Sequence, residues 1–172
     1  MNFDYFPDET PKGLTAAARA IGERLAKKHF TAPPIDVEKL ITHDFGFTLR
    51  KLELPDNVSG NAHINLKEVT INTRKSIAHQ RFTLAHELGH IVLKHDARRW
   101  TEFGDLNESS PDQPMEEEAN AFAAGLLMPS FLLKPLAIAK KTPKETALMF
   151  QVSEQAMWYS YKTYKLEKYL YR

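Results

Sequence analysis

Two histidines and a glutamate interrupt an otherwise apolar stretch, RFTLAHELGHIVLKH, at residues 81–95. In an α-helix, residues four apart lie on one face, about 6 Å apart along the axis, so His86 and His90 can bind one metal ion together. Glu87 is rotated by about 100° from His86, so its carboxylate can act beside the metal without being a ligand. The spacing predicts an HExxH metallopeptidase site with His86 and His90 as ligands and Glu87 as the catalytic general base.

A catalytic zinc site needs three protein ligands and one open position. The chain has no cysteine, so the third ligand must be a histidine, an aspartate or a glutamate. The strongest candidate is Glu116 in the segment EEEAN, residues 116–120, because Asn120 lies one turn further on the same helical face. From there the Asn120 amide can hydrogen-bond the outer nitrogen of a ligand histidine. Asp96 is the alternative third ligand, although Leu93 stands where the longer HExxHxxGxxH motif needs glycine.

The other polar residues near these motifs are assigned ordinary roles. We expect His79 and His95 to be helix residues that point away from the metal, and Glu117 and Glu118 to lie on a solvated face. Gly89 is expected to leave room for another backbone to approach the histidine helix closely. The stabiliser of the reaction's oxyanion stays open, with three candidates: His63, Tyr159 and Tyr161.

Elements that could position these residues follow from hydrophobic periodicity and turn signals. An α+β domain is expected, with a small antiparallel sheet from the extended runs 47–54, 58–64 and 68–72. Helices are predicted over residues 11–30, 36–43 and 76–95, and from Pro114 to a point before Pro129. The helix at 76–95 would carry the HExxH motif, and the helix after Pro114 would carry Glu116 and Asn120.

Beyond residue 138 the pattern predicts two capped helices joined at QVS, the outline of a helix-turn-helix. Thr142 and Ser153 are the expected N-caps, and Glu145 completes a capping box with Thr142. From Lys140 onward seven Lys and Arg stand against three Asp and Glu, yet the start of the second helix offers no arginine to read a base. DNA binding is therefore less expected than packing on the core or docking onto protein.

Composition places the chain among ordinary globular proteins. It has 172 residues, 42% hydrophobic and 26% charged, with a net charge of +1. We expect three units: an N-terminal segment and helix (1–34), a metallopeptidase domain (35–138) and a helical extension (139–172). The start of the chain does not read as a secretory signal, and the longest apolar run, 121–133, is too short to span a bilayer. A cytoplasmic protein with no membrane partner is expected.

The paired motifs RFTLAHELGH and EEEANAFAAGLLMPSFLL resemble those of the ImmA/IrrE family of HExxH metallopeptidases. The resemblance covers most of residues 35–135 and implies a minimal zincin-like core in which Glu116 is the third ligand. It also implies a cytoplasmic protease that cleaves a helix-turn-helix repressor and so relieves repression of phage, mobile-element or stress genes. One Zn²⁺ per chain is expected, with Mn²⁺ possible because imidazole and carboxylate ligands accept both.

Two other functions stay open at this stage. The chain could be a DNA-binding or protein-binding regulator whose metal site is structural or vestigial, or a component of a toxin–antitoxin pair. Three ligands plus Glu87 favour the enzyme, because a purely structural zinc more often has four protein ligands. The sequence does not identify the substrate or its cleavage site, the oligomeric state or an activating signal.

Overall fold

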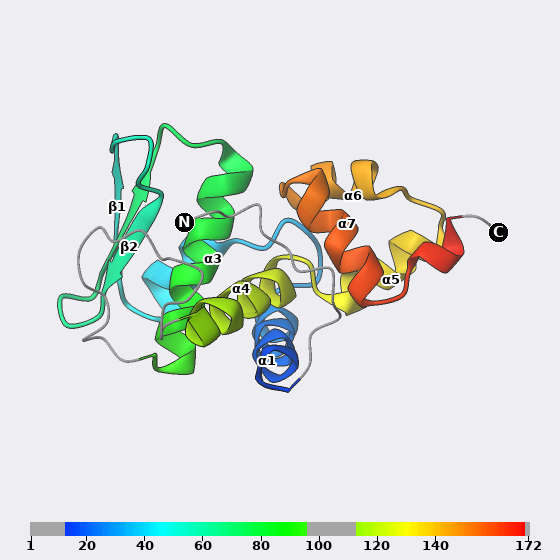
Figure 1. Ribbon diagram of the computed structural model, residues 1–172, viewed down its shortest axis with the longest axis horizontal. Coiled ribbons are helices and arrows are strands. Elements are labelled where there is room, and N and C mark those ends of the chain that lie inside the picture. The colour runs from blue at the N-terminus through cyan, green and yellow to red at the C-terminus, as the bar shows by residue number, and fades with distance from the viewer. Residues whose placement is uncertain (1–12, 96–112, 171–172) are drawn as a thin grey trace.

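A computed structural model describes residues 13–95 and 113–170 of the chain. The sheet lies at one end, α3 and α4 run through the middle, and α5, α6 and α7 lie at the other end (Figure 1). The elements, in chain order, are α1 (Leu14–His29), α2 (Val37–Lys39), a π-helical segment (Leu40–Asp44), β1 (Thr48–Leu52), β2 (Gly60–His63), β3 (Glu68–Asn72), α3 (Ile77–Leu93), α4 (Gln113–Leu127), α5 (Ser130–Ile138), α6 (Pro143–Phe150), α7 (Glu154–Thr163) and a 3₁₀ turn (Glu167–Tyr169).

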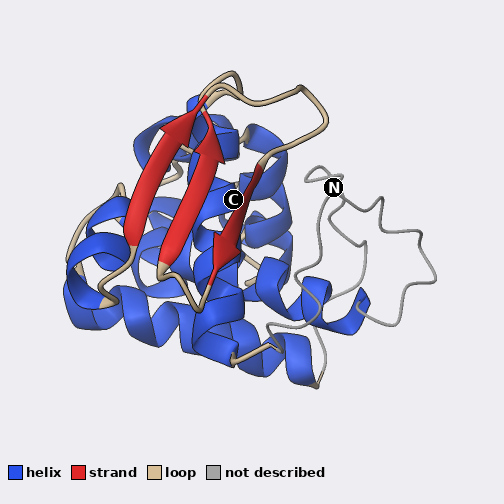
Figure 2. Cartoon of the chain, turned by 90° about the vertical axis from the view of Figure 1, so that its left-hand side faces the viewer, coloured by secondary structure: helices blue, strands red, loops and turns tan. Residues whose placement is uncertain are grey.

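The sheet is small, as expected, but it is mixed rather than antiparallel. β3 lies in the middle, pairing antiparallel with β2 and parallel with β1, in the order β1-β3-β2. The prediction of an antiparallel sheet is therefore wrong for β1. The chain leaves β1, crosses over β3 and returns as β2 on the far side, and the helices lie behind one face of the sheet (Figure 2).

A fully buried asparagine holds the crossing between β1 and β2. The Asn72 side chain donates to the carbonyls of Leu54, Pro55 and Val58 at 3.1, 3.1 and 2.7 Å and accepts from the Leu54 N–H at 3.0 Å. Because buried backbone groups need partners, these bonds satisfy a connection that has no strand of its own. The bonds tie the end of β3 to the connection that leads into β2, one of the two outer strands.

The core forms where α1, α3 and α4 meet. Gly89 on α3 faces α4, and a Cβ there would lie 3.2 Å from both the Cα and the carbonyl oxygen of Ala119. Gly125 on α4 is tighter still against α1, since its Cβ would lie 2.2 Å from the Arg19 carbonyl oxygen. The expected role of Gly89, allowing a close backbone approach, is confirmed.

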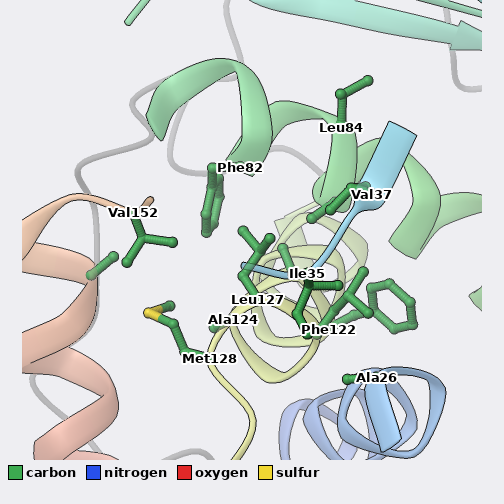
Figure 3. Close-up of a cluster of buried hydrophobic side chains, with 14 of the residues drawn as sticks. Ala26, Ile35, Val37, Phe82, Leu84, Phe122, Ala124, Leu127, Met128 and Val152 are labelled. Carbon is green, nitrogen blue, oxygen red and sulfur yellow. The ribbon is translucent and has the colours of Figure 1, made fainter. Parts of the chain in front are cut away.

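The C-terminal helices share this core. Phe82 of α3, Leu127 and Met128 at the end of α4, and Val152 between α6 and α7 belong to one buried cluster (Figure 3). Both predicted N-caps are present: Thr142 forms a full capping box with Glu145, and the Ser153 hydroxyl accepts from the Ala156 N–H. The division of the chain at residues 34 and 138 and a helix-turn-helix role for α6 and α7 stay predictions.

The apolar run at 121–133 lies in the core, where Ala121–Met128 and Leu133 are buried. Among the helices of residues 13–95 and 113–170, none alone is long and apolar enough to cross a membrane, whereas α4 and α5, bent by 54°, pass that test only as a pair.

Candidate metal centre and catalytic site

The histidines of the HExxH motif lie side by side in the middle of α3. Helix geometry places them one turn apart, and their Nε2 atoms are 2.9 Å from each other. His86 is fully buried and His90 nearly so. Two buried imidazoles whose Nε2 atoms point toward one place can fill two of the four positions around a tetrahedral metal ion.

Glu116 reaches the same point from α4. Its carboxylate oxygens lie 3.2 Å from the His86 Nε2 and 3.4 Å from the His90 Nε2. Ligands of a tetrahedral zinc ion, each bound at about 2.0–2.1 Å, are separated from one another by about 3.3 Å. The separations of 2.9, 3.2 and 3.4 Å match that spacing, and among the described residues this is the group of three that could hold a metal ion.

The donor set also fits a divalent ion chemically. Two imidazoles and one carboxylate are ligands that Zn²⁺ and Mn²⁺ accept, and they leave a coordination position open. The structure brings together the residues that the sequence proposed as ligands, although their binding of metal stays a prediction. Asp96, the alternative third ligand, lies outside the described residues.

Asn120 lies against the outer edge of one of the imidazoles. Its Oδ1 is 2.9 Å from the His86 Nδ1, on the ring edge opposite the Nε2 that faces Glu116. An amide oxygen can only accept, so the hydrogen bond places a proton on the His86 Nδ1. The Nε2 lone pair can then be donated to a cation, which is the arrangement that the spacing of Glu116 and Asn120 predicted.

Two expectations are wrong: that His95 points away from the metal, and that Glu118 lies on a solvated face. The helix ends at Leu93, Lys94 adopts the left-handed conformation, and the His95 N–H bonds to the His90 carbonyl at 3.1 Å. The chain therefore turns back, and the His95 Nδ1 lies 2.7 Å from the His90 Nδ1. Glu118, expected on a solvated face, is largely buried with its Oε2 3.4 Å from the His95 Nε2, whereas Glu117 contacts Gln113 on the exposed side.

Glu87 is buried next to the three candidate ligands. Burial, together with the negative charge of Glu116, raises the pKa of its carboxyl to about 7, although His86 and a hydrogen bond from the Ala62 backbone act in the opposite direction. Within residues 13–95 and 113–170, its Oε2 has no hydrogen-bond partner. A buried carboxyl with one unbonded oxygen and a pKa near neutrality is suited to exchange protons at pH 7.

Charge is distributed unequally over the two histidines. Burial lowers the pKa of His86, but the Glu116 carboxylate outweighs it, so the pKa is raised overall. Burial also lowers the pKa of His90, and the neighbouring His86 and His95 lower it further. His86 therefore binds a proton more readily than His90 does, and a divalent cation would compete with that proton.

The three oxyanion candidates have contacts with other parts of the chain, and the choice among them stays open. Ala62 of β2 is buried on the helix side, so by strand alternation His63 projects from the other face, where it contacts Asn61. Tyr161 is buried and donates to the Lys141 carbonyl, and Tyr159 stacks against Arg19. His79 bonds Ser59 at the start of α3. None of these contacts is with His86, His90 or Glu116.

Comparison with known proteins shows the family of the chain. Residues 43–160 match the family model described as the IrrE N-terminal-like domain, Peptidase_M78. The chain belongs to the IrrE N-terminal-like family, which confirms the resemblance drawn from the two motifs.

Two curated relatives are radiation response metalloproteases IrrE. The protein from Deinococcus deserti is 30% identical over 131 residues, and that from Deinococcus radiodurans is 32% identical over 127 residues. The matched regions cover 76% and 72% of this chain but 46% and 38% of the relatives. The chain thus spans less than half the length of these proteins.

A solved structure has the same fold. A Mycobacterium tuberculosis transcriptional regulator superposes with a TM-score of 0.70 at 16% identity, covering 86% of this chain and 47% of that one. At this identity the likeness concerns the fold alone.

Proposed function

We propose that this protein is a metal-dependent endopeptidase with a zincin-like site, in which His86, His90 and Glu116 hold one Zn²⁺ and Glu87 is the general base. The observation that carries the proposal is the convergence of three ligand atoms with tetrahedral spacing beside a buried carboxyl whose Oε2 has no hydrogen-bond partner among the described residues. Membership of the IrrE N-terminal-like family supports it, as does the name metalloprotease given to both relatives.

When bound, the cation supplies Lewis-acid polarisation of water and of the scissile carbonyl. Glu87 removes a proton from the attacking water and returns it to the leaving amine, with its unbonded Oε2 as the proton carrier. His86 and His90 stay neutral as ligands, and Asn120 keeps the His86 proton on Nδ1.

An extended peptide can reach Glu87 along β2. Among the described residues β2 is one of the two outer strands of the sheet, and it is the one whose Ala62 backbone bonds to Glu87. An outer strand can pair its free backbone groups with an extended segment of another chain. This supports cleavage of a protein segment rather than of a small amide.

The proposed substrate is a helix-turn-helix repressor, whose cleavage would make this protein an anti-repressor acting in the cytoplasm. Support comes from the resemblance to the ImmA/IrrE family, and the word "regulator" in the name of the similar Mycobacterium structure is compatible with such a role. The first residues of α7, Glu154 and Gln155, are exposed and include no cation, which favours a protein partner over DNA for this helix.

The test is incubation with the repressor encoded beside the gene, in the presence of Zn²⁺, with fragments identified by mass spectrometry. Glu87→Gln keeps the shape of the side chain but removes the basic oxygen, so cleavage should fall by about 100- to 10,000-fold while folding and metal binding persist. Glu117→Gln, at an exposed position of α4 next to Glu116 in the sequence, is the matched control and should cleave normally. If the wild-type protein never cleaves the repressor yet relieves repression equally with and without Glu87, the protein acts by binding and the proposal is wrong.

A further inference from the structure

The two candidate ligand histidines are supported on their outer edges by different groups. The Nδ1 of His86 faces the Asn120 amide oxygen at 2.9 Å, whereas the Nδ1 of His90 faces the Nδ1 of His95 at 2.7 Å. His95 in turn places its Nε2 3.4 Å from a carboxylate oxygen of Glu118. A chain of three side chains therefore runs from Glu118 to the candidate metal site.

Ring chemistry fixes the direction of this chain. If the Nε2 of His90 binds a cation, its neutral ring carries the proton on Nδ1, which must donate to the Nδ1 of His95. His95 then accepts at Nδ1 and carries its own proton on Nε2, from which it donates to Glu118. His90 therefore donates to His95, and His95 donates to Glu118. A carboxylate can only accept, which favours this direction of donation.

The contact between His95 and His90 depends on how the chain leaves the C-terminal end of α3. His95 could not approach His90 from a continuous helix, because five residues along a helix it would face another direction. The left-handed Lys94 and the bond from the His95 N–H to the His90 carbonyl bring it back. The side chains of His95 and Glu118 are 8% and 19% exposed, so water competes little for their contact.

We propose that His95 and Glu118 are a positioning pair that holds His90 in the tautomer and orientation needed for metal binding, as Asn120 does for His86. The inference rests on the proposed metal site and adds a contribution from outside the three ligands. Partners on the outer nitrogen of a ligand histidine fix the ring and increase its basicity, and their loss typically lowers metal affinity by about 10- to 100-fold.

The experiment measures Co²⁺ and Zn²⁺ affinity of the full chain by competition with a chelator, together with the visible absorption of the Co²⁺ complex. His95→Ala is expected to weaken binding by about 10- to 100-fold and to change the Co²⁺ spectrum. His95→Asn places an amide oxygen near the former Nδ1 and should restore most of the affinity, since Asn120 uses the same group on His86. Glu117→Gln is the matched control and should leave affinity and spectrum unchanged.

Glu118 is tested by a double-mutant cycle. Glu118→Ala should weaken binding by about 2- to 10-fold in the wild-type background, as expected for one lost hydrogen bond, and have no effect beside His95→Asn, which lacks the ring Nε2. Circular dichroism checks that each variant folds, and if His95→Ala does not, His95→Asn and the cycle decide the question.

The inference is overturned if His95→Ala binds metal as tightly as wild type, if His95→Asn binds no better than His95→Ala, or if Glu118→Ala has the same effect in both backgrounds. Failure of the proposed metal site would look different. In that case the wild-type protein and His86→Ala would bind Co²⁺ equally weakly, and neither reading would survive.

Discussion

Glu87 should make the metal-free protein less stable at neutral and alkaline pH. Its pKa rises from an ordinary value of 4.5 to about 7 in the fold because the carboxyl is buried. At about 1.4 kcal/mol for each pKa unit, ionising it in the folded state costs about 3 kcal/mol more than in the unfolded chain. For a carboxyl whose folded pKa is raised, stability is fully present below pH 4.5 and is lost as the pH rises to about 7.

Glu87→Gln removes this ionisation while keeping the shape of the side chain. The gain in unfolding free energy over wild type should therefore grow with pH, by about 2 to 3 kcal/mol between pH 5 and pH 8. Urea denaturation with a chelator present measures it at each pH, with the exposed Glu117→Gln as control for net charge. An equal gain at pH 5 and pH 8, or the same pH dependence in Glu117→Gln, would refute the reasoning that burial holds Glu87 as a neutral acid.

Three further outcomes are expected. Asn120→Ala should lower Zn²⁺ affinity by about 10- to 100-fold in a chelator competition, because His86 loses the acceptor on its Nδ1. Gly125→Ala should lower the free energy of unfolding by about 1–3 kcal/mol in urea, since its Cβ would lie 2.2 Å from the Arg19 carbonyl and two helix backbones would have to move. Lys94→Gly should raise the melting temperature by a few degrees with metal affinity unchanged, because glycine adopts the left-handed conformation without the strain, about 1 kcal/mol, of a side chain.

Periodicity and capping signals in the sequence predicted most of the helices. The expected helix at 11–30 is observed at Leu14–His29, the helix that begins near Pro114 at Gln113–Leu127, and the two C-terminal helices start after their predicted caps. These features depend on residues at most four apart, so a single chain carries the information. His86 with His90, and Glu116 with Asn120, are also only four residues apart, so their shared helix faces could be predicted from the sequence.

The mixed sheet could not be predicted in this way. Three short extended runs in succession suggest neighbouring antiparallel strands, and the pairing of β2 with β3 follows that expectation. The position of β1 depends instead on Asn72, whose amide satisfies the backbone of the connection from Leu54 to Val58. In the sequence Asn72 is merely the polar end of a strand, because its partners lie 14 to 18 residues earlier.

The expectation for His95 is wrong for a related reason. Its contact with His90 requires the chain to leave the helix at Lys94 with positive φ, a position at which glycine or asparagine is the usual signal. Lysine there gives no such signal, so the apolar periodicity was extended two residues too far. Glu118 is expected on a solvated face because it lies near the start of its helix and off the face of Glu116 and Asn120; its contact with His95, 23 residues earlier in the chain, leaves no signal at helical spacing.

The separation of α3 and α4 is the variable on which the candidate site depends most. His86 and His90 come from one helix and Glu116 from the other, so every distance between histidine and carboxylate changes with that separation. Gly89 sets it, because a Cβ at that position would already be 3.2 Å from the Ala119 backbone. Glycine in the middle of a helix costs about 1 kcal/mol of stability relative to alanine. At position 89 this cost accompanies a close approach of α3 and α4, which brings three ligand atoms within reach of one ion.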